Sequence, residues 1–275
     1  MPRDIISPLL AFDIGNTTVS LALMDGTRVL FTARFPTDYQ FNSRQYADQI
    51  RDVLIKNHIS DENFKNLYCM ISSVVPPVCD AIRGAVLNLT GKTPVIAGAD
   101  LNTGFHILVD TPEKTGADRI ILAAGALSCC QPPLILIDMG TATTIDILEP
   151  PDLYLGGMIL PGTQISLDAL ASRTAQLPEI NLYKISKNQF NPPLIGKNTI
   201  DCMLSGALYG SAAMIDGLID RLEAERGHPF QIIAAGGVSG MIIPLCRHAI
   251  KTDADLIPRG LAVLAGLNPE AFDQS

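Results

Sequence analysis

The stretch LLAFDIGNTTVSLAL (Leu9–Leu23) decides the fold, because an altered copy of it, LILIDMGTATTIDIL, returns at Leu134–Leu148. At one constant offset Asp13 matches Asp138, 125 residues later. Each copy is an apolar run, an Asp-x-Gly turn and a second apolar run, which is typical of a strand, a tight turn and a second strand. The chain is therefore predicted to contain two related halves.

Small polar residues follow the aspartate in both copies. At the same offset Gly15 matches Gly140 and Thr18 matches Thr143. Glycine lets a backbone approach a ligand closely. The N–H groups and hydroxyls of such a turn suit phosphate, and its aspartate can hold a hydrated cation. One Asp-x-Gly is most often an ordinary hairpin turn, but its duplication favours two turns that grip a nucleotide triphosphate.

Composition bounds the class of protein. The chain has 275 residues, of which 47% are hydrophobic and only 5% aromatic, with no Trp. This predicts a large aliphatic core of the kind found in buried sheets flanked by helices. The formal net charge is −8. Since no basic stripe stands out, neither nucleic acid nor an anionic membrane is expected as a partner.

Cysteine usage and the N-terminus predict a cytoplasmic protein. Six cysteines are scattered without metal-ligand spacing, so we expect reduced and mostly buried thiols. Ser7 and Pro8 interrupt the apolar stretch 5–12, so no signal peptide is expected there. No apolar run is expected to reach membrane-spanning length.

Periodicity and turn signals predict an alternation of strands and helices. Asp25-Gly26 is the expected hairpin turn, and Ser43 the expected cap of the first helix. Strands are expected at 9–12, 19–24, 29–35, 67–72, 93–96, 134–138, 143–148, 154–157 and 232–235. Helices are expected at 43–57, 76–89, 117–130, 165–172, 198–225 and 259–267. The irregular stretch 173–197 is interpreted as a lid or an interface loop.

Two such halves resemble the superfamily of actin, hexokinase and heat-shock chaperone ATPases, and within it the motifs resemble the type III pantothenate kinases. In chain order the matching segments are DIGNT (Asp13–Thr17), SSVVP (Ser72–Pro76), GADR (Gly116–Arg119), DMGTATTID (Asp138–Asp146), GGMILPG (Gly156–Gly162), TAQLP (Thr174–Pro178), GKNT (Gly196–Thr199) and SGALYG (Ser205–Gly210). They span almost the whole chain.

The resemblance implies an α/β fold of two similar actin-like (ribonuclease H-like) lobes, residues 1–115 and 116–275. Each lobe would be a mixed sheet flanked by helices, with the active site in the cleft between them. The implied reaction is ATP-dependent phosphorylation of pantothenate to 4'-phosphopantothenate, the first step of coenzyme A biosynthesis.

The resemblance also implies the nucleotide site. Asp13 would orient Mg²⁺ through water, and Asp138 would bind a monovalent cation, K⁺ or NH₄⁺. The alternative for Asp138 is that it answers Asp13 as a second residue that orients Mg²⁺. The implied ATP contacts are Asp13, Ile14, Gly15, Asn16, Thr17, Thr18, Val19, Ser20 and Thr141.

For the acceptor, the resemblance implies that Asp118 is the general base that takes the proton of the pantothenate hydroxyl. The alternative from the sequence alone is helix capping, because an aspartate in a first turn favours the exposed N–H groups there. Arg119 could instead pair with Glu113, and Thr199 could be only a helix N-terminal hydroxyl. The implied substrate contacts are Gly116, Ala117, Asp118, Arg119 and Thr199.

A homodimer is implied as well, with the small-residue helix 198–226 as a candidate interface; ordinary core packing is the alternative.

Two places in the sequence depart from the family pattern. AAGGVSG, around Gly236-Gly237, lacks the Thr that often precedes the adenosine-binding glycines, and Val109 stands where many members carry Tyr. The four histidines have no partner spacing, so surface or cap roles are expected.

Two other functions use the same features. One is a different reaction on this scaffold, such as that of a sugar or acetate kinase or of a polyphosphate phosphatase. The other is a nucleotide-sensing regulator without catalysis. Retention of Asp13, Asp118, Asp138 and Thr141 favours an enzyme.

Overall fold

The computed structural model describes residues 6–98, 100–185 and 192–273, and the chain forms two compact units. Unit 1 comprises the residues up to 106, 110–129 and those from 255 onward; unit 2 comprises 107–109 and 130–254. This division differs from the expected boundary between 115 and 116. Helices α3 (Ala117–Leu127) and α7 (Leu256–Leu267) pack on each other and on strand β4 (Tyr68–Ser73), so both belong to unit 1.

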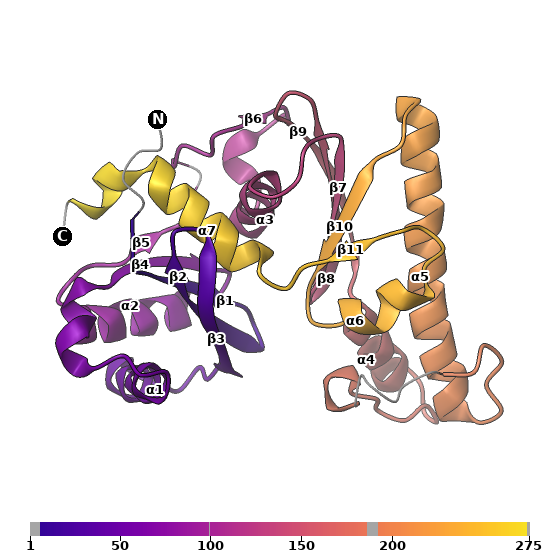
Figure 1. Cartoon of the computed structure of the whole chain (residues 1–275). Coiled ribbons are helices and arrows are strands. Elements are labelled where there is room, and N and C mark those ends of the chain that lie inside the picture. The colour runs from indigo at the N-terminus through magenta and orange to yellow at the C-terminus, as the bar shows by residue number, and fades with distance from the viewer. Residues whose placement is uncertain (1–5, 99, 186–191, 274–275) are drawn as a thin grey trace. The chain divides into compact units, whose positions relative to one another are not determined.

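Unit 1 is built on a five-stranded sheet of order β3-β2-β1-β4-β5, in which β1 runs antiparallel to β2 and parallel to β4 (Figure 1). Its further elements are β1 (Leu9–Ile14), β2 (Thr18–Asp25), β3 (Arg28–Pro36), α1 (Ser43–Lys56), η1 (Asp61–Asn66), α2 (Pro76–Thr90), β5 (Val95–Ile96), η2 (Pro112–Lys114) and η5 (Pro269–Phe272).

Unit 2 is built on a six-stranded sheet of order β11-β10-β7-β8-β9-β6. The short strand β6 (His106–Ile107) adds to its edge. The other elements are β7 (Leu134–Met139), β8 (Ala142–Glu149), β9 (Leu153–Pro161), α4 (Thr163–Arg173), η3 (Leu182–Lys184), α5 (Thr199–Arg226), β10 (Gln231–Ala235), α6 (Ser239–Ile242), η4 (Ile243–Leu245) and β11 (Lys251–Thr252).

The predicted repeat is confirmed in the sheets. The order β3-β2-β1-β4-β5 recurs as β9-β8-β7-β10-β11, and β1 and β7 share one burial pattern. The constant offset of 125 residues between the two copies, however, does not hold after the turn. Val19 pairs with Ile14, whereas Thr143 pairs with Met139. The second turn is therefore one residue shorter, and Thr143 is the structural equivalent of Val19 and not of Thr18.

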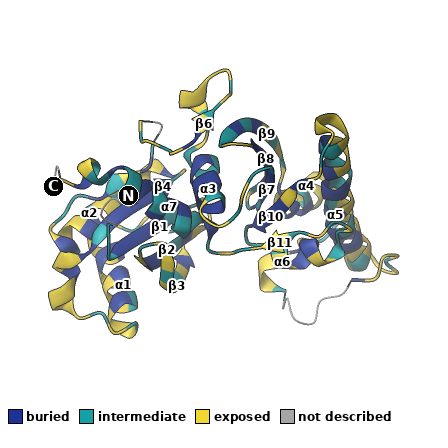
Figure 2. Cartoon of the chain, turned by 45° about the horizontal axis from the view of Figure 1, so that its top comes forward, coloured by how far each residue is buried: buried dark blue, intermediate teal, exposed yellow. Residues whose placement is uncertain are grey.

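The two faces of the unit 1 sheet differ in what covers them. Leu10, Phe12 and Ile14 point into a core shared with α1 and α2, whereas α7 packs across β1, β2, β3 and β4. Figure 2 shows β1 and β4 as buried strands within this unit. Because side chains alternate along a strand, Leu9, Ala11 and Asp13 lie on the face that α7 covers.

The first helix begins as its sequence dictates, one residue away from the predicted cap. The Asn42 side chain accepts from the backbone N–H of Arg44 and Gln45, and the Gln45 side chain accepts from the N–H of Asn42. This is a capping box. Ser43, expected as the cap, is the first helical residue.

Helix α5 is the long core helix of unit 2. By length and apolar composition alone it could cross a membrane, which corrects the expectation that no run reaches that length; 44% of its apolar window is buried in unit 2. Its buried Asp216 accepts from the backbone N–H groups of Arg247 and His248. A core helix of a soluble domain has the same features.

Three minor expectations, on the cysteines, the histidines and the segment 173–197, have different outcomes. Cys69 and Cys79 are buried, but Cys129 and Cys202 are exposed, so the expectation of mostly buried thiols is wrong. His228 contacts Glu149 and His248 contacts Asp220, which confirms structural roles for both. Of the supposed lid 173–197, residues 186–191 lie outside the described residues.

Candidate functional site

Asp13 lies in a polar row that crosses the unit 1 sheet. It pairs with Ser72 of β4 on one side and with Ser20 of β2 on the other, and Ser20 pairs with Arg34 of β3. Residues directly opposite each other on neighbouring strands point to the same face. The row Ser72, Asp13, Ser20 and Arg34 therefore shares the face on which Asp13 lies, at the carboxyl end of β1.

The electrostatics of Asp13 mark it as a functional carboxylate. Burial, together with the negative charge of Asp118, raises the pKa of Asp13 to about 6. A hydrogen bond from the buried Ser72 hydroxyl and the positive charge of Arg34 act in the opposite direction. Desolvation and a like charge in one place are typical of active sites.

Helix α3 brings Asp118 to this site. The helix follows Gly116, and Asp118 lies in its first turn, where its Oδ1 accepts from the N–H of Arg119 at 2.9 Å. A capping contribution therefore exists, as the sequence alternative held. The negative charge of Asp118 also acts on Asp13, and both residues belong to unit 1.

Two glycines fix where α3 lies. A Cβ on Gly125 of α3 would stand 2.1 Å from the Leu256 carbonyl oxygen, and a Cβ on Gly260 of α7 would stand 1.9 Å from the Ile121 carbonyl oxygen. Only glycine permits helices to approach this closely. Since α7 also packs on β1, the sheet, α7 and α3 together position Asp118 relative to Asp13.

The turn after β1 is braced by the segment that leaves β3. Gly15 N–H donates to the Thr18 carbonyl at 3.0 Å. The Thr37 hydroxyl donates to the Gly15 carbonyl at 2.7 Å, and Thr37 N–H donates to the Thr17 carbonyl at 3.1 Å. Asn16, Thr17 and Thr18 are exposed. The result is a fixed turn whose polar side chains remain accessible to a ligand.

The corresponding turn of unit 2 carries Asp138 at the end of β7, where it pairs with Thr144 of β8. The Thr144 hydroxyl is buried and has no hydrogen-bond partner among the described residues. Leaving a buried hydroxyl unsatisfied costs about 1–3 kcal/mol. A carboxylate opposite an unused hydroxyl oxygen is a donor set that suits a hard monovalent cation.

Gly236 and Gly237 lie beside the same turn. Gly236 has φ +98°, and a Cβ there would stand 2.5 Å from the backbone of Met139, so the loop after β10 touches the end of β7. A Cβ on Gly237 would stand 3.0 Å from the ring of Tyr183. Burial and the charges of Asp168 and Asp138 raise the pKa of Tyr183. Tyr183 is thus a neighbour of Asp138 that the sequence did not indicate.

The GGMILPG segment holds the other side of this turn. A Cβ on Gly162 would stand 2.1 Å from the Thr141 carbonyl oxygen, so the start of α4 lies against the turn. Gly156 has φ +94°, and a Cβ there would be 3.2 Å from the Val109 side chain. Val109, at the position of the family tyrosine, therefore packs over Gly156 within unit 2.

Thr199 is the first residue of α5, after the cap residue Asn198, whose side chain accepts from Asp201 N–H at 2.9 Å. Thr199 therefore lies at a helix N-terminus, as the alternative from the sequence has it. Thr199 also borders an apolar hollow between α4 and α5. The side chains of that hollow include Leu167, Leu170, Leu177, Cys202 and Met203.

The structure thus divides the predicted site residues between the units. Unit 1 contains Asp13 to Ser20 and Gly116 to Arg119; unit 2 contains Asp138, Thr141 and Thr199. That the two groups line one cleft stays a prediction. The sequence alone does not indicate Ser72, Arg34 or Thr144 as site residues, although Ser72 and Thr144 lie inside quoted motifs. Strand register is the signal that finds them.

Comparison with known proteins agrees with this geometry. A family described as type III pantothenate kinase matches residues 9–221. A type III pantothenate kinase from Thermus thermophilus is 39% identical over 259 residues, which cover 92% of this chain and 96% of that protein.

Solved structures share the fold at low identity. An activator of 2-hydroxyisocaproyl-CoA dehydratase from Clostridium difficile, with bound ADPNP, has a TM-score of 0.57 at 14% identity and covers 97% of this chain and 96% of that chain. A putative Baf family transcriptional activator from Campylobacter jejuni has a TM-score of 0.53 at 19% identity and covers 95% of this chain and 99% of that chain. The predicted actin-like ATPase fold is confirmed.

The raised pKa of Asp13 predicts a pH-dependent cost in stability. Between about pH 4 and 6 the folded protein holds a proton on Asp13 that the unfolded chain releases. The protonated carboxyl keeps the free energy of unfolding at its full value below pH 4, and this contribution is lost as the pH rises through 6. The difference between 3.8 and about 6 corresponds to about 3 kcal/mol. Asp13→Asn is therefore expected to raise the free energy of unfolding by up to about that amount at pH 7.5 and by little at pH 4.

Urea denaturation without Mg²⁺ and nucleotide measures this difference. Asp48→Asn, an exposed carboxylate on α1, is the matched control and should change stability by less than about 0.5 kcal/mol at either pH. Equal stability of Asp13→Asn and the wild type at pH 7.5 would contradict the electrostatic account.

Proposed function

Because the chain belongs to the type III pantothenate kinase family, we propose that it transfers the γ-phosphoryl group of ATP to the primary hydroxyl of pantothenate. The product is 4'-phosphopantothenate, in the first step of coenzyme A biosynthesis. The observation that carries the proposal is the coupled carboxylate pair Asp13 and Asp118, in a chain that matches the family over residues 9–221.

Unit 1 supplies the phosphate contacts and the base. The fixed, exposed turn from Asp13 to Ser20 receives the phosphates of ATP. Asp118 accepts the hydroxyl proton as the pantothenate oxygen attacks the γ-phosphorus in line. The transition state of phosphoryl transfer is loose, so the protein acts chiefly by positioning the reactants and stabilising charge.

Mg²⁺ fits the residues at the end of β1. Asp13 is a partly buried carboxylate, and burial together with the negative charge of Asp118 raises its pKa, so a bound cation would offset both effects. Asp13 would hold the ion through water. When bound, Mg²⁺ would stabilise the negative charge that develops on the phosphate oxygens during transfer.

The monovalent cation fits Asp138 of unit 2. The buried, unpartnered hydroxyl of Thr144 directly opposite supports the assignment, because it would become a ligand or a neighbour of the ion. Thr141, exposed in the same turn, contacts ATP.

On the acceptor side we propose that Gly116, Ala117 and Arg119, at the start of α3, bind pantothenate together with Thr199. Backbone N–H groups at a helix start donate to oxygen acceptors of a ligand. The hydroxyl end of pantothenate offers such oxygens beside Asp118, whereas its carboxylate is at the opposite end of the molecule.

A homodimer through unit 2 is also proposed. Positions 206, 210 and 217 of α5 lie on one face, and a Cβ at each of these glycines would meet nothing within 4 Å among the described residues. This open face lies next to the hollow between α4 and α5. The exposed apolar side chains of the region are Ile165, Leu170, Leu194, Ile195 and Ile200. A second copy would cover them.

A coupled kinase assay tests the function directly. ATP consumption is expected only when pantothenate is added. Consumption with a sugar or acetate, or hydrolysis of polyphosphate, would replace the proposal by another reaction of the superfamily. Binding of ATP without turnover of pantothenate would favour a regulator.

Asp118→Asn should lower kcat by about 10²–10⁴-fold, because the general base is lost. The amide still offers an Oδ1 acceptor to Arg119 N–H, so folding should be unchanged. Glu113→Gln, an exposed carboxylate in the preceding turn, is the matched control and should retain activity. Steady-state kinetics and thermal unfolding measure both variants. Near-wild-type turnover of Asp118→Asn removes Asp118 from the mechanism.

Activity should rise steeply with K⁺ or NH₄⁺ relative to Na⁺. Thr144→Val, which keeps the shape of the side chain and removes its oxygen, should raise the K⁺ concentration needed for half-activation without abolishing folding. Titration of activity with each chloride salt at constant ionic strength measures this. Indifference of the wild type to the choice of cation would refute the Asp138 assignment.

Multi-angle light scattering at micromolar concentration should give twice the chain mass of 29.5 kDa. Leu170→Glu on α4 should shift the protein towards monomer. Leu87→Glu on α2 is the matched control, since both leucines are 44% exposed. A monomeric wild-type protein would refute the dimer.

A further inference from the structure

Arg34 lies in the polar row of unit 1, two strands away from Asp13. Its partner Ser20 separates the two residues, and neighbouring strands are about 4.8 Å apart, so the Cα atoms of Asp13 and Arg34 are about 10 Å apart. Arg34 is exposed. Arg34 nevertheless shares the face of Asp13 through the register with Ser20, and its positive charge acts on Asp13.

A bulge in the hairpin directs Arg34 to this face. Near the turn Met24 pairs with Val29, but beyond the bulge Leu23 pairs with Phe31, so one extra residue is accommodated in β3. Without the bulge Ser20 would pair with Ala33, and Arg34 would point to the opposite face, because a shift of one residue reverses the faces of a strand. The same bulge recurs between Ile147 and Leu148.

The internal repeat provides a control for the row. In unit 2 Asp138 pairs with Ala235 and Thr144, and Thr144 pairs with Ile159. Ile159, the equivalent of Arg34, is 68% exposed. The scaffold therefore does not require a charged residue at this position. The cation is particular to the half that carries the paired carboxylates.

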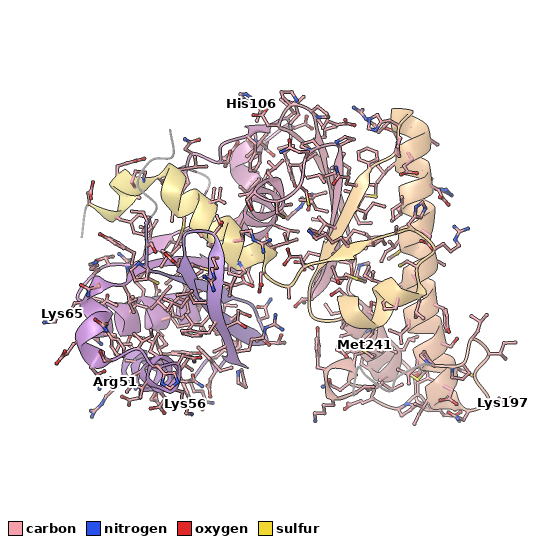
Figure 3. The ribbon with its side chains drawn as sticks, in the orientation of Figure 1. Arg51, Lys56, Lys65, His106, Lys197 and Met241 are labelled. Carbon is pink, nitrogen blue, oxygen red and sulfur yellow. The ribbon has the colours of Figure 1, made fainter. Side chains whose placement is uncertain are left out.

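A phosphate at the turn 13–20 needs a positive partner from outside that turn. Residues 13–20 contain no Lys or Arg, and the site already includes Asp13 and Asp118. Arg51, Lys56 and Lys65 lie on or beside α1 and η1 (Figure 3), and α1 covers the opposite face of the sheet. Arg51 is moreover paired with Asp61 at 3.4 Å.

We propose that Arg34 is a phosphate-contacting residue of this site, whose guanidinium group donates to a phosphate oxygen of the nucleotide held at the turn 13–20. The inference rests on the proposed function for the identity of the nucleotide. A guanidinium group suits this role because its planar fork matches two oxygens of a phosphate. Mg²⁺ and Arg34 would then share the negative charge of the triphosphate.

The test compares Arg34→Gln, Arg34→Lys and Arg28→Gln. Arg28 lies at the start of the same strand, next to the hairpin turn and on the other side of the bulge from Arg34. It is exposed as Arg34 is, so it is the matched control for the loss of one exposed charge. Ligand-observed NMR titrations with Mg·ATP and with adenosine, without pantothenate, measure weak binding to each folded variant. Arg34→Gln is expected to weaken ATP binding by about 10–100-fold and to leave adenosine binding unchanged. Arg34→Lys should lose less, and Arg28→Gln nothing.

Kinetics give the second measurement. In Arg34→Gln the KM for ATP should rise while the KM for pantothenate stays constant. Unchanged ATP binding would overturn the proposal, as would an equal loss of ATP and adenosine binding, which indicates a structural role. If Arg34→Gln does not fold, Arg34→Lys decides the outcome by the same comparison. Because the titrations contain no pantothenate, they remain valid even if another acceptor is the substrate.

Discussion

The burial of the Asp13 carboxylate, with the negative charge of Asp118 acting on it, is the constraint that the site in unit 1 must accommodate. Burial makes the ionised form of Asp13 costly, and the negative charge of Asp118 on α3 raises that cost further. A carboxylate kept in such surroundings costs stability, which is typical of a residue retained for a function and not for folding.

The surrounding residues make this arrangement tolerable and fix it in place. Ser72 and Arg34 act on Asp13 from both sides of its strand row. The close approach of α3 and α7 at Gly125 and Gly260 fixes the start of α3, and with it Asp118. A base must lie at the correct position relative to the phosphate, and rigid secondary structure provides that position better than a loop does.

Duplication gave two turns with one backbone plan and different chemistry. Both sheets share strand order and hairpin bulge, but the second turn is one residue shorter. The row through Asp13 is polar and ends in a cation. The row through Asp138 runs from Ala235 through Asp138 and the buried hydroxyl of Thr144 to Ile159, so it offers no cationic side chain to a triphosphate. The two halves are thus interpreted as a phosphate half and a cation half.

The sequence predicts the strands, their repeat and the residues of the quoted motifs, because apolar runs and Asp-x-Gly turns are local signals. It does not predict the contributions that depend on register. Arg34 reaches the face of Asp13 only through a bulge, which the alternating pattern of β3 does not indicate. The packing of α7 on α3 is not predicted either, since that contact joins segments far apart in the chain. Asn42 replaced Ser43 as the cap because Asn42 is the residue that is three positions before Gln45.

The most direct test of the central claim is the titration of the Asp13 carboxyl by carbon-13 NMR, in the wild type and in Asp118→Asn. The account predicts a pKa of about 6 in the wild type, and a lower value in the variant that remains above 3.8 because burial persists. A wild-type carboxyl that titrates near 3.8, or one that titrates identically in both proteins, would contradict it.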